Sequence, residues 1–144
     1  MSVQNYSETL MDHFQSPRNR ESIPDADAVG ISGTPGQGPY MVLYVRMDGN
    51  RIADAFFQCN GCGVTIACGS MLTDLVEGMS LTECRKLTPE RLIETFDRIP
   101  VHKQDRAAFS LCALWNALDQ IEGKDEGRSD TELRRSVEKK ENRK

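Results

Sequence analysis

The chain has 144 residues, a formal net charge of -4 at pH 7 and a pI near 5.2. A chain of this length folds as one domain with a modest core and leaves no room for a second catalytic domain. The negative charge gives no general attraction to nucleic-acid phosphates or anionic lipids, so we expect no nucleic-acid partner and no membrane partner.

Hydrophobic periodicity predicts an α+β domain, in which a small antiparallel sheet of about three strands packs with several helices. In chain order we expect a helix over 6–15, a loop over 22–39 with a short strand near 28–31, strands over 40–47 and 51–58, and helices over 64–77, 80–87, 88–96 and 105–122. The turn Asp48-Gly49-Asn50 joins the two longer strands as a hairpin. We expect residues 1–122 to form the domain and the charged residues 123–144 to be a tail, either disordered or a solvated helix.

The amino-terminal residues lack a basic segment followed by an apolar run, and the sequence contains no stretch of about 18 apolar residues. We therefore expect a cytoplasmic protein. The chain also carries five cysteines. An odd number of cysteines without an export signal argues against a disulfide framework and for buried thiols, metal ligands or redox chemistry.

Cys62 lies where a strand-like segment passes through glycines into a helix-like segment, in the run Gly61-Cys62-Gly63. The first backbone N–H groups of a helix have no partner within it and carry partial positive charge. A cysteine at such a place tends to ionise, and its thiolate is the form that binds metal or accepts sulfur. We therefore expect a site of sulfur chemistry at Cys62.

From about residue 6 to residue 121, the chain resembles the IscU/NifU N-terminal (U-type) family of iron–sulfur cluster assembly scaffolds. The resemblance is carried by the order of the elements and by short runs: Tyr6-Ser7-Glu8, Asp12-His13-Phe14, Ser16-Pro17-Arg18-Asn19, Gly33-Thr34-Pro35 and Gly61-Cys62-Gly63. It implies the U-type scaffold fold and a protein that is not an enzyme. It also implies iron or an iron–sulfur cluster as cargo and a cysteine desulfurase or other assembly protein as partner, and it leaves a homo-oligomer open.

The sequence departs from the family at the first ligand loop. Where the family has a cysteine followed by glycine and aspartate, this chain has Gln37 at the cysteine and Pro39 at the aspartate. Two groups of the family's site are therefore replaced.

The third ligand position depends on the alignment. Placing the family cysteine on Cys112 requires an insertion and puts polar residues at apolar positions. The gapless alignment, which we prefer, puts Asp105 at the family histidine and Arg106 at the family cysteine. Cys62 is then the one ligand retained, whereas a cluster is normally held by about four ligands, mostly thiolates.

Two thiols could still form a rebuilt metal site. Cys59 and Cys62 have the spacing that lets two sulfurs reach one metal ion, and Asp105 or His102 could complete a zinc site. Alternatively Cys59 is a core residue and no cofactor is bound, or the two cysteines form a redox pair. We expect Cys68, Cys84 and Cys112 to pack in the core and His13 to lie at the surface.

Arg106 has two interpretations. It is either a solvated residue at a helix start that Asp105 caps, or its guanidinium pairs with the Cys62 thiolate in place of a metal.

Two functions follow from the resemblance. The first is a scaffold or carrier that accepts sulfur or iron. The second is a cluster-free binding or regulatory paralogue that docks on a cysteine desulfurase or scaffold partner, with zinc at Cys59 and Cys62 as an option.

Overall fold

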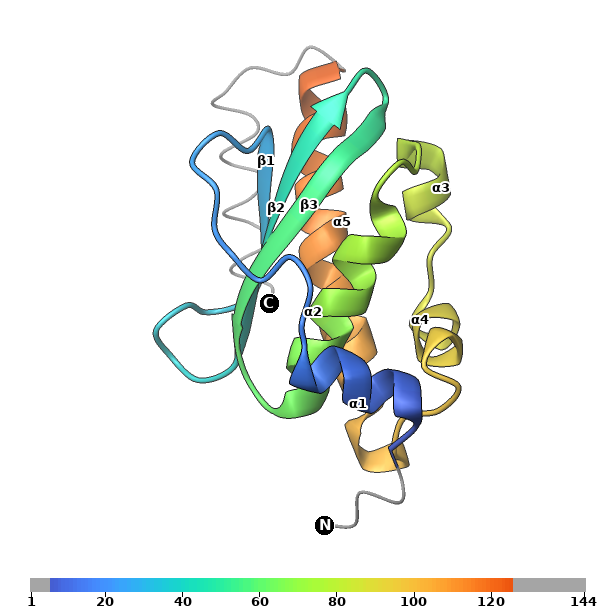
Figure 1. The fold of residues 1–144 in the computed structure, drawn as a ribbon. Helices are drawn as coiled ribbons and strands as arrows, with labels where there is room; N and C mark the ends of the chain where they lie inside the picture. Colours follow the sequence, from blue (N-terminus) through green and yellow to red (C-terminus); the bar gives the residue numbers. More distant parts are fainter. Residues whose placement is uncertain (1–5, 126–144) are drawn as a thin grey trace.

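The computed structural model describes residues 6–125, which form an α+β domain, as the sequence predicts. The elements in chain order are α1 (Glu8–Gln15), β1 (Ala28–Gly33), β2 (Tyr40–Asp48), β3 (Arg51–Asn60), α2 (Gly63–Val76), α3 (Leu81–Arg85), α4 (Pro89–Thr95), a short 3-10 helix (Val101–Lys103) and α5 (Asp105–Asp125). Figure 1 shows the strands as one sheet and the helices packed beside it.

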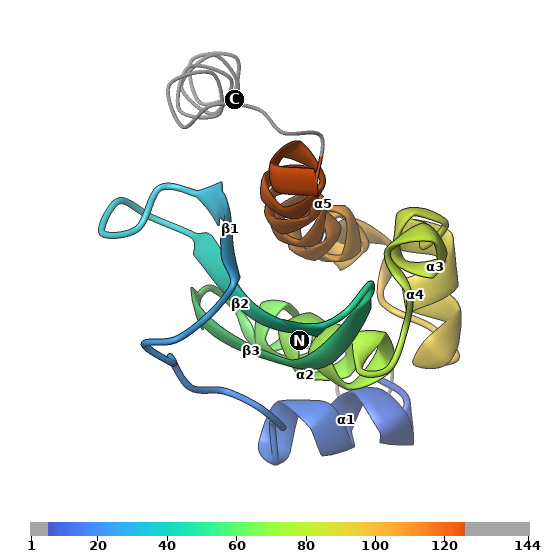
Figure 2. The same cartoon turned by 90° about the horizontal axis from the view of Figure 1, so that it is seen from above.

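The three strands form one antiparallel sheet in the order β1-β2-β3. The predicted hairpin joins β2 to β3, with Gly49 at a φ of 65° that suits glycine. Residues alternate along β2 between buried and half-buried, so one face of the sheet carries the core. On that face α5 packs on β1 and β2, α2 packs on β3, and the two helices contact each other, with α1 outside α2 (Figure 2).

One row of paired residues fixes how the two long helices lie on the sheet. Gly30, Leu43 and Phe57 are neighbours across the three strands, and Leu43 and Phe57 are fully buried. At Gly30 the backbone of α5 comes so close that a Cβ would lie 1.9 Å from the carbonyl oxygen of Ala113. At the other end of the row, a Cβ on Gly69 of α2 would lie 2.6 Å from the Phe57 ring. Glycines therefore let both helices approach the sheet closely.

Replacing Gly30 with alanine should force α5 away from β1. We expect the free energy of unfolding to fall by about 1–3 kcal/mol, the usual cost of overpacking a core. Urea denaturation followed by circular dichroism measures this fall. The variant Ser32→Ala, at a buried position of the same strand, is the control and should change stability less. Equal stability of Gly30→Ala and the parent would contradict the close approach.

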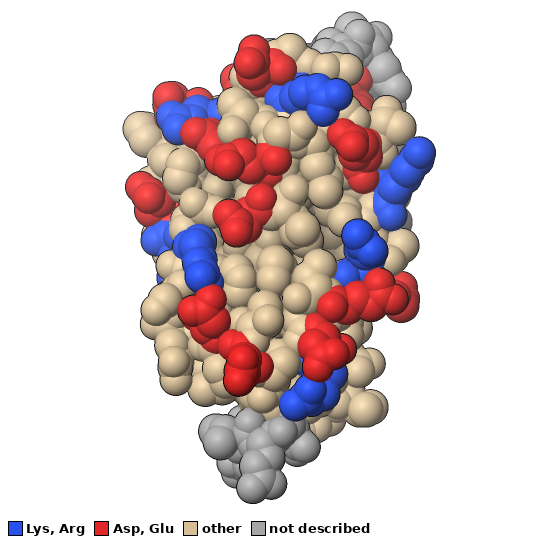
Figure 3. Space-filling view, turned by 45° about the vertical axis from the view of Figure 1, so that its right-hand side comes forward, with Lys and Arg blue, Asp and Glu red and all other residues tan. Residues whose placement is uncertain are grey.

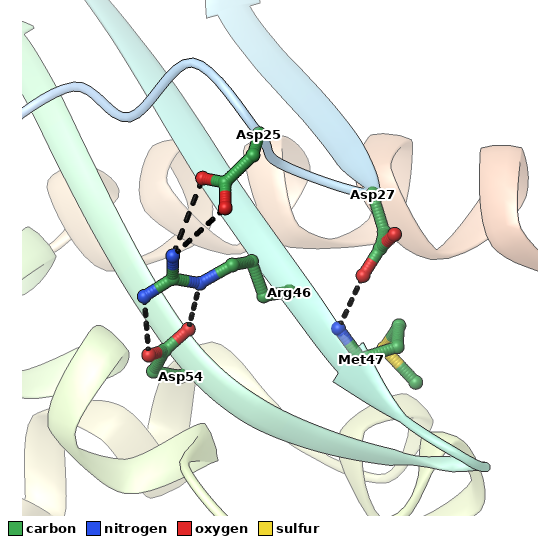
Figure 4. A network of polar contacts seen from close by, with 5 residues as sticks. All are labelled: Asp25, Asp27, Arg46, Met47 and Asp54. Carbon is green, nitrogen blue, oxygen red and sulfur yellow. Dashed lines mark hydrogen bonds and ion pairs between the residues drawn. The ribbon is translucent and has the colours of Figure 1, made fainter.

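The segment that precedes β1 is tied to the sheet by a polar network. Arg46 on β2 binds Asp54 on β3 through two hydrogen bonds of 2.8 and 2.7 Å, and it reaches Asp25 at 3.2 Å (Figure 4). Asp27 accepts a hydrogen bond of 2.6 Å from the backbone N–H of Met47. These contacts hold residues 25–27 beside the sheet at the start of β1.

His13 was expected at the surface, and that prediction is wrong: the residue is buried. Its Nδ1 lies 2.7 Å from the hydroxyl oxygen of Ser70 on α2, which also accepts a hydrogen bond from the backbone N–H of Arg18. The ring of Phe96 packs edge-on against the imidazole. The spacing of apolar residues within α1 could not show that α2 and Phe96 cover the side of the helix that carries His13.

Burial, and then the charge of Arg18, lower the pKa of His13 below its ordinary value. The fold therefore favours neutral His13, and this contribution to stability is present above about pH 6.5 and is lost as the pH falls. Urea denaturation at pH 7.5 and pH 5.5 should show a smaller loss of stability in His13→Gln than in the parent. In the control His102→Gln, which alters an exposed histidine, the loss should match that of the parent.

Several predicted boundaries differ from the structure, including the following three. β1 runs on to Gly33, α5 continues through Gly123 to Asp125, and Asp105 is the first residue of α5 rather than its cap. The expected tail of residues 123–144 therefore begins within α5, and its residues 126–144 lie outside the described part of the chain.

The visible charges do not form a basic patch on the face in Figure 3, where positive and negative side chains are interspersed around an uncharged centre. None of the helices within residues 6–125 combines the length and apolar character that crossing a bilayer requires.

Candidate functional site at Cys62

Cys62 is the N-cap of α2, at the corner where β3 ends, as the sequence predicts. Its extended backbone, with φ of -78° and ψ of 175°, turns the chain from the strand into the helix. The thiol is half-buried, and its sulfur lies 3.7 Å from the hydroxyl oxygen of Thr65 in the first turn of α2.

The start of α5 meets the start of α2 at this thiol. A hollow of about 300 Å³ is lined there by Pro39, Cys62, Thr65, Asp105, Arg106 and Phe109. The three segments that contribute these residues are far apart in the sequence: the loop before β2, the turn after β3 and the first turns of α5. The hollow thus brings Cys62 together with Pro39, Asp105 and Arg106, the residues that the preferred alignment places at family ligand-site positions.

Opposing influences set the acidity of the Cys62 thiol. Burial raises its pKa, but hydrogen bonds from the backbone and hydroxyl of Thr65, from Arg106 and from the backbone of Val64 lower it, and the pKa comes to about 7. A large share of Cys62 is therefore thiolate at neutral pH. By contrast, burial raises the pKa of Cys68 to about 12 and that of Cys84 to about 11, so these thiols stay protonated.

Arg106 is held in place by its neighbours. Its guanidinium donates a hydrogen bond of 2.6 Å to Asp105 and one of 3.3 Å to the backbone oxygen of His102. It lines the same hollow as Cys62 and helps to lower the pKa of that thiol. Its side chain keeps 32% of its accessible surface. Of the two interpretations of Arg106, the pairing of the guanidinium with the thiolate stays a prediction, which the shared hollow supports.

Removing this guanidinium should make Cys62 a weaker acid. In a Cys112→Ser background, which removes the exposed thiol of α5, we expect Arg106→Gln to slow alkylation of Cys62 at pH 6 by roughly threefold to tenfold. Near pH 10 the two rates should converge, because both thiols are then ionised.

The matched control for that experiment is Arg98→Gln. Arg98 is an exposed arginine that pairs with Asp97 and does not line the hollow. The pH dependence of Cys62 alkylation in Arg98→Gln should match that of the parent. If Arg106→Gln also matches the parent, Arg106 does not act on the thiol.

Other predicted site residues lie elsewhere. Gln37 is exposed and does not line the hollow, and His102 is exposed in the 3-10 helix. Cys59 lies in β3 and packs in the core, where burial raises the pKa of its thiol. Within residues 6–125, no group of three or more His, Cys, Asp or Glu side chains comes together as a metal site would require.

The remaining cysteines divide into two groups. Cys68 and Cys84 are buried, as predicted, but Cys112 is exposed, and its expected place in the core is wrong. The buried face of α5 carries Leu111, Ala113 and Leu114, so Cys112 falls between them on the opposite side. It lines a second hollow beside β1, whose lining does not include Cys62.

Two residues of the site were missed in the sequence. Thr65 follows Cys62 by three positions, the spacing at which a residue of the first helical turn meets the N-cap, and this spacing was a usable signal. Phe109 is one of several apolar residues of α5, and no sequence pattern distinguished its place as a wall of the hollow.

Comparison with known proteins identifies the family. The family model described as the NifU-like N terminal domain matches residues 5–127. The chain belongs to this family. Within it, the chain is 38% identical over 113 residues to iron–sulfur cluster assembly scaffold protein IscU 1 of Archaeoglobus fulgidus, a match that covers 78% of this chain and 74% of that protein.

Further relatives belong to the same group. IscU of Haemophilus influenzae is 37% identical over 100 residues, covering 67% of this chain and 79% of the relative. The nitrogen fixation protein NifU of Cereibacter sphaeroides is 38% identical over 114 residues, covering 79% of this chain but 46% of that longer protein.

Solved structures show the same fold. The N-terminal part of a NifU-like protein from Brucella abortus aligns with a TM-score of 0.69 at 15% identity, covering 85% of this chain and 97% of that one. A chain from Fervidobacterium islandicum AW-1, assigned as a scaffold for the SUF system, aligns with a TM-score of 0.65 at 20% identity, covering 82% of this chain and 99% of that one. The predicted U-type scaffold fold is confirmed.

Proposed function

We propose that this chain works in iron–sulfur cluster assembly by accepting sulfur on Cys62. The observation that carries the proposal is the placement of a thiol with a pKa of about 7 at the start of α2, in a hollow open to a partner. Family membership supports it, since the named relatives are assembly scaffolds.

The sulfur would arrive as the outer atom of a persulfide on a donor protein, with a cysteine desulfurase as the expected donor. The Cys62 thiolate attacks that outer sulfur, a new S–S bond forms, the donor's S–S bond breaks, and the donor thiol leaves as a thiolate. No net oxidation or reduction occurs. The chain acts here as a stoichiometric acceptor rather than an enzyme, and residues 1–122 would suffice for this role.

Cluster assembly on the chain alone does not suit the residues present. Of the described residues that line the hollow, Cys62 supplies the thiol, whereas Pro39 and Arg106 cannot replace thiolate ligands. Any metal that does bind would sit at Cys62 with Cys59 or Asp105. The alternative of a docking paralogue without sulfur chemistry is not favoured, because the acidic thiol and its hydrogen bonds are retained.

Sulfur transfer should depend on Cys62 and not on the other accessible thiol. After incubation with a cysteine desulfurase and cysteine, intact-mass analysis should find a persulfide on the parent and on Cys112→Ser. The variant Cys62→Ser should lose at least about nine-tenths of this signal, because the remaining buried thiols are protonated. A persulfide that is lost in Cys112→Ser and kept in Cys62→Ser would overturn the proposed function.

A further inference from the structure

The positions around Cys62 carry positive charge where a metal centre would need ligands. Two helix N-termini, those of α2 and α5, point at the hollow, and each carries partial positive charge. The guanidinium of Arg106 adds a full positive charge to the lining that it shares with Cys62. Asp105 offsets part of this charge, but its carboxylate is largely exposed and already bonded to Arg106.

This arrangement acts against a cation in two ways. A guanidinium has no lone pair to offer a metal and stays protonated at any ordinary pH, so Arg106 cannot become a ligand. It also places its positive charge in the hollow that Cys62 lines, and like charges repel most strongly where water is partly excluded. Arg106 therefore weakens metal binding in two ways, because it supplies no ligand and because it adds positive charge.

The same arrangement suits the persulfide anion of Cys62, which has one sulfur atom more than the thiolate. A persulfide on Cys62 carries its negative charge on the outer sulfur, which would extend from the half-buried thiol into the hollow. There it meets the guanidinium, which forms stronger hydrogen bonds to a charged acceptor than to a neutral one. Phe109 and Pro39 provide apolar walls that keep the site from being fully solvated.

We infer that Arg106 determines the cargo of this site: it selects a sulfane sulfur held as the Cys62 persulfide anion and rejects a metal cation. The inference rests on the proposed function, because sulfur transfer to Cys62 must take place, and it deepens that function by naming what the site holds. Arg106 acts here as a specificity-determining residue that contacts the cargo.

The first arm of the test measures metal binding under anaerobic conditions with zinc ion alone. We expect the parent to bind zinc weakly, and Arg106→Cys, which places a thiolate beside Cys62, to bind at least about tenfold more tightly. Adding Cys62→Ser to Arg106→Cys should abolish the gain. If the parent binds zinc through Cys62 as tightly as Arg106→Cys does, the rejection of metal is wrong.

The second arm measures the equilibrium of sulfane sulfur between Cys62 and a free thiol at pH 6, with inorganic polysulfide as the source. A persulfide is a stronger acid than a thiol, so the loaded form is the anion that Arg106 should stabilise. We expect Arg106→Gln to hold roughly threefold less sulfur on Cys62, and Arg106→Lys to keep part of the parent's loading. Circular dichroism verifies that each variant is folded, and Arg98→Gln is the control that should match the parent.

The outcomes separate the inference from the proposed function. Equal loading of the parent and Arg106→Gln overturns the role of Arg106 while leaving Cys62 as an acceptor. No loading of the parent by either polysulfide or a desulfurase, with normal alkylation of Cys62, overturns the proposed function instead.

Discussion

The close approach of two helices to one row of the sheet positions everything else in this molecule. Gly30, Leu43 and Phe57 cross the three strands in one line, with α5 lying on the first and Gly69 of α2 lying on the last. Side chains at these glycines would push the helices outward, so the spacing of α2 and α5 depends on small residues and on a buried aromatic ring.

Along both helices, the same number of residues separates the contact with this row of the sheet from the residue at the Cys62 site. Cys62 precedes Gly69 by seven residues, and Arg106 precedes Ala113 by seven residues, about 10 Å of helix in each case. The two N-termini therefore meet at one end of the domain, where the thiol of one helix faces the guanidinium of the other. Core packing and the chemistry of the site are thus linked through rigid helices rather than through a flexible loop.

The sequence predicted the fold well because its signals are local. A turn at Gly49 and a change from strand to helix at Cys62 each depend on a few neighbouring residues, and each is found in the structure. The burial of His13 and the exposure of Cys112 were predicted wrongly, because each depends on which face of a helix its neighbours cover. The meeting of Arg106 with Cys62 could be expected only from the family alignment, since more than 40 residues separate them in the chain.

We propose that this member of the family carries sulfur at a site from which its own arginine keeps metal away. Quantitation of iron and sulfane sulfur in untagged protein isolated without oxygen tests it most directly. We expect sulfane sulfur on Cys62 and iron far below one atom per chain. Stoichiometric iron with acid-labile sulfide, lost on replacement of Cys62, would contradict it.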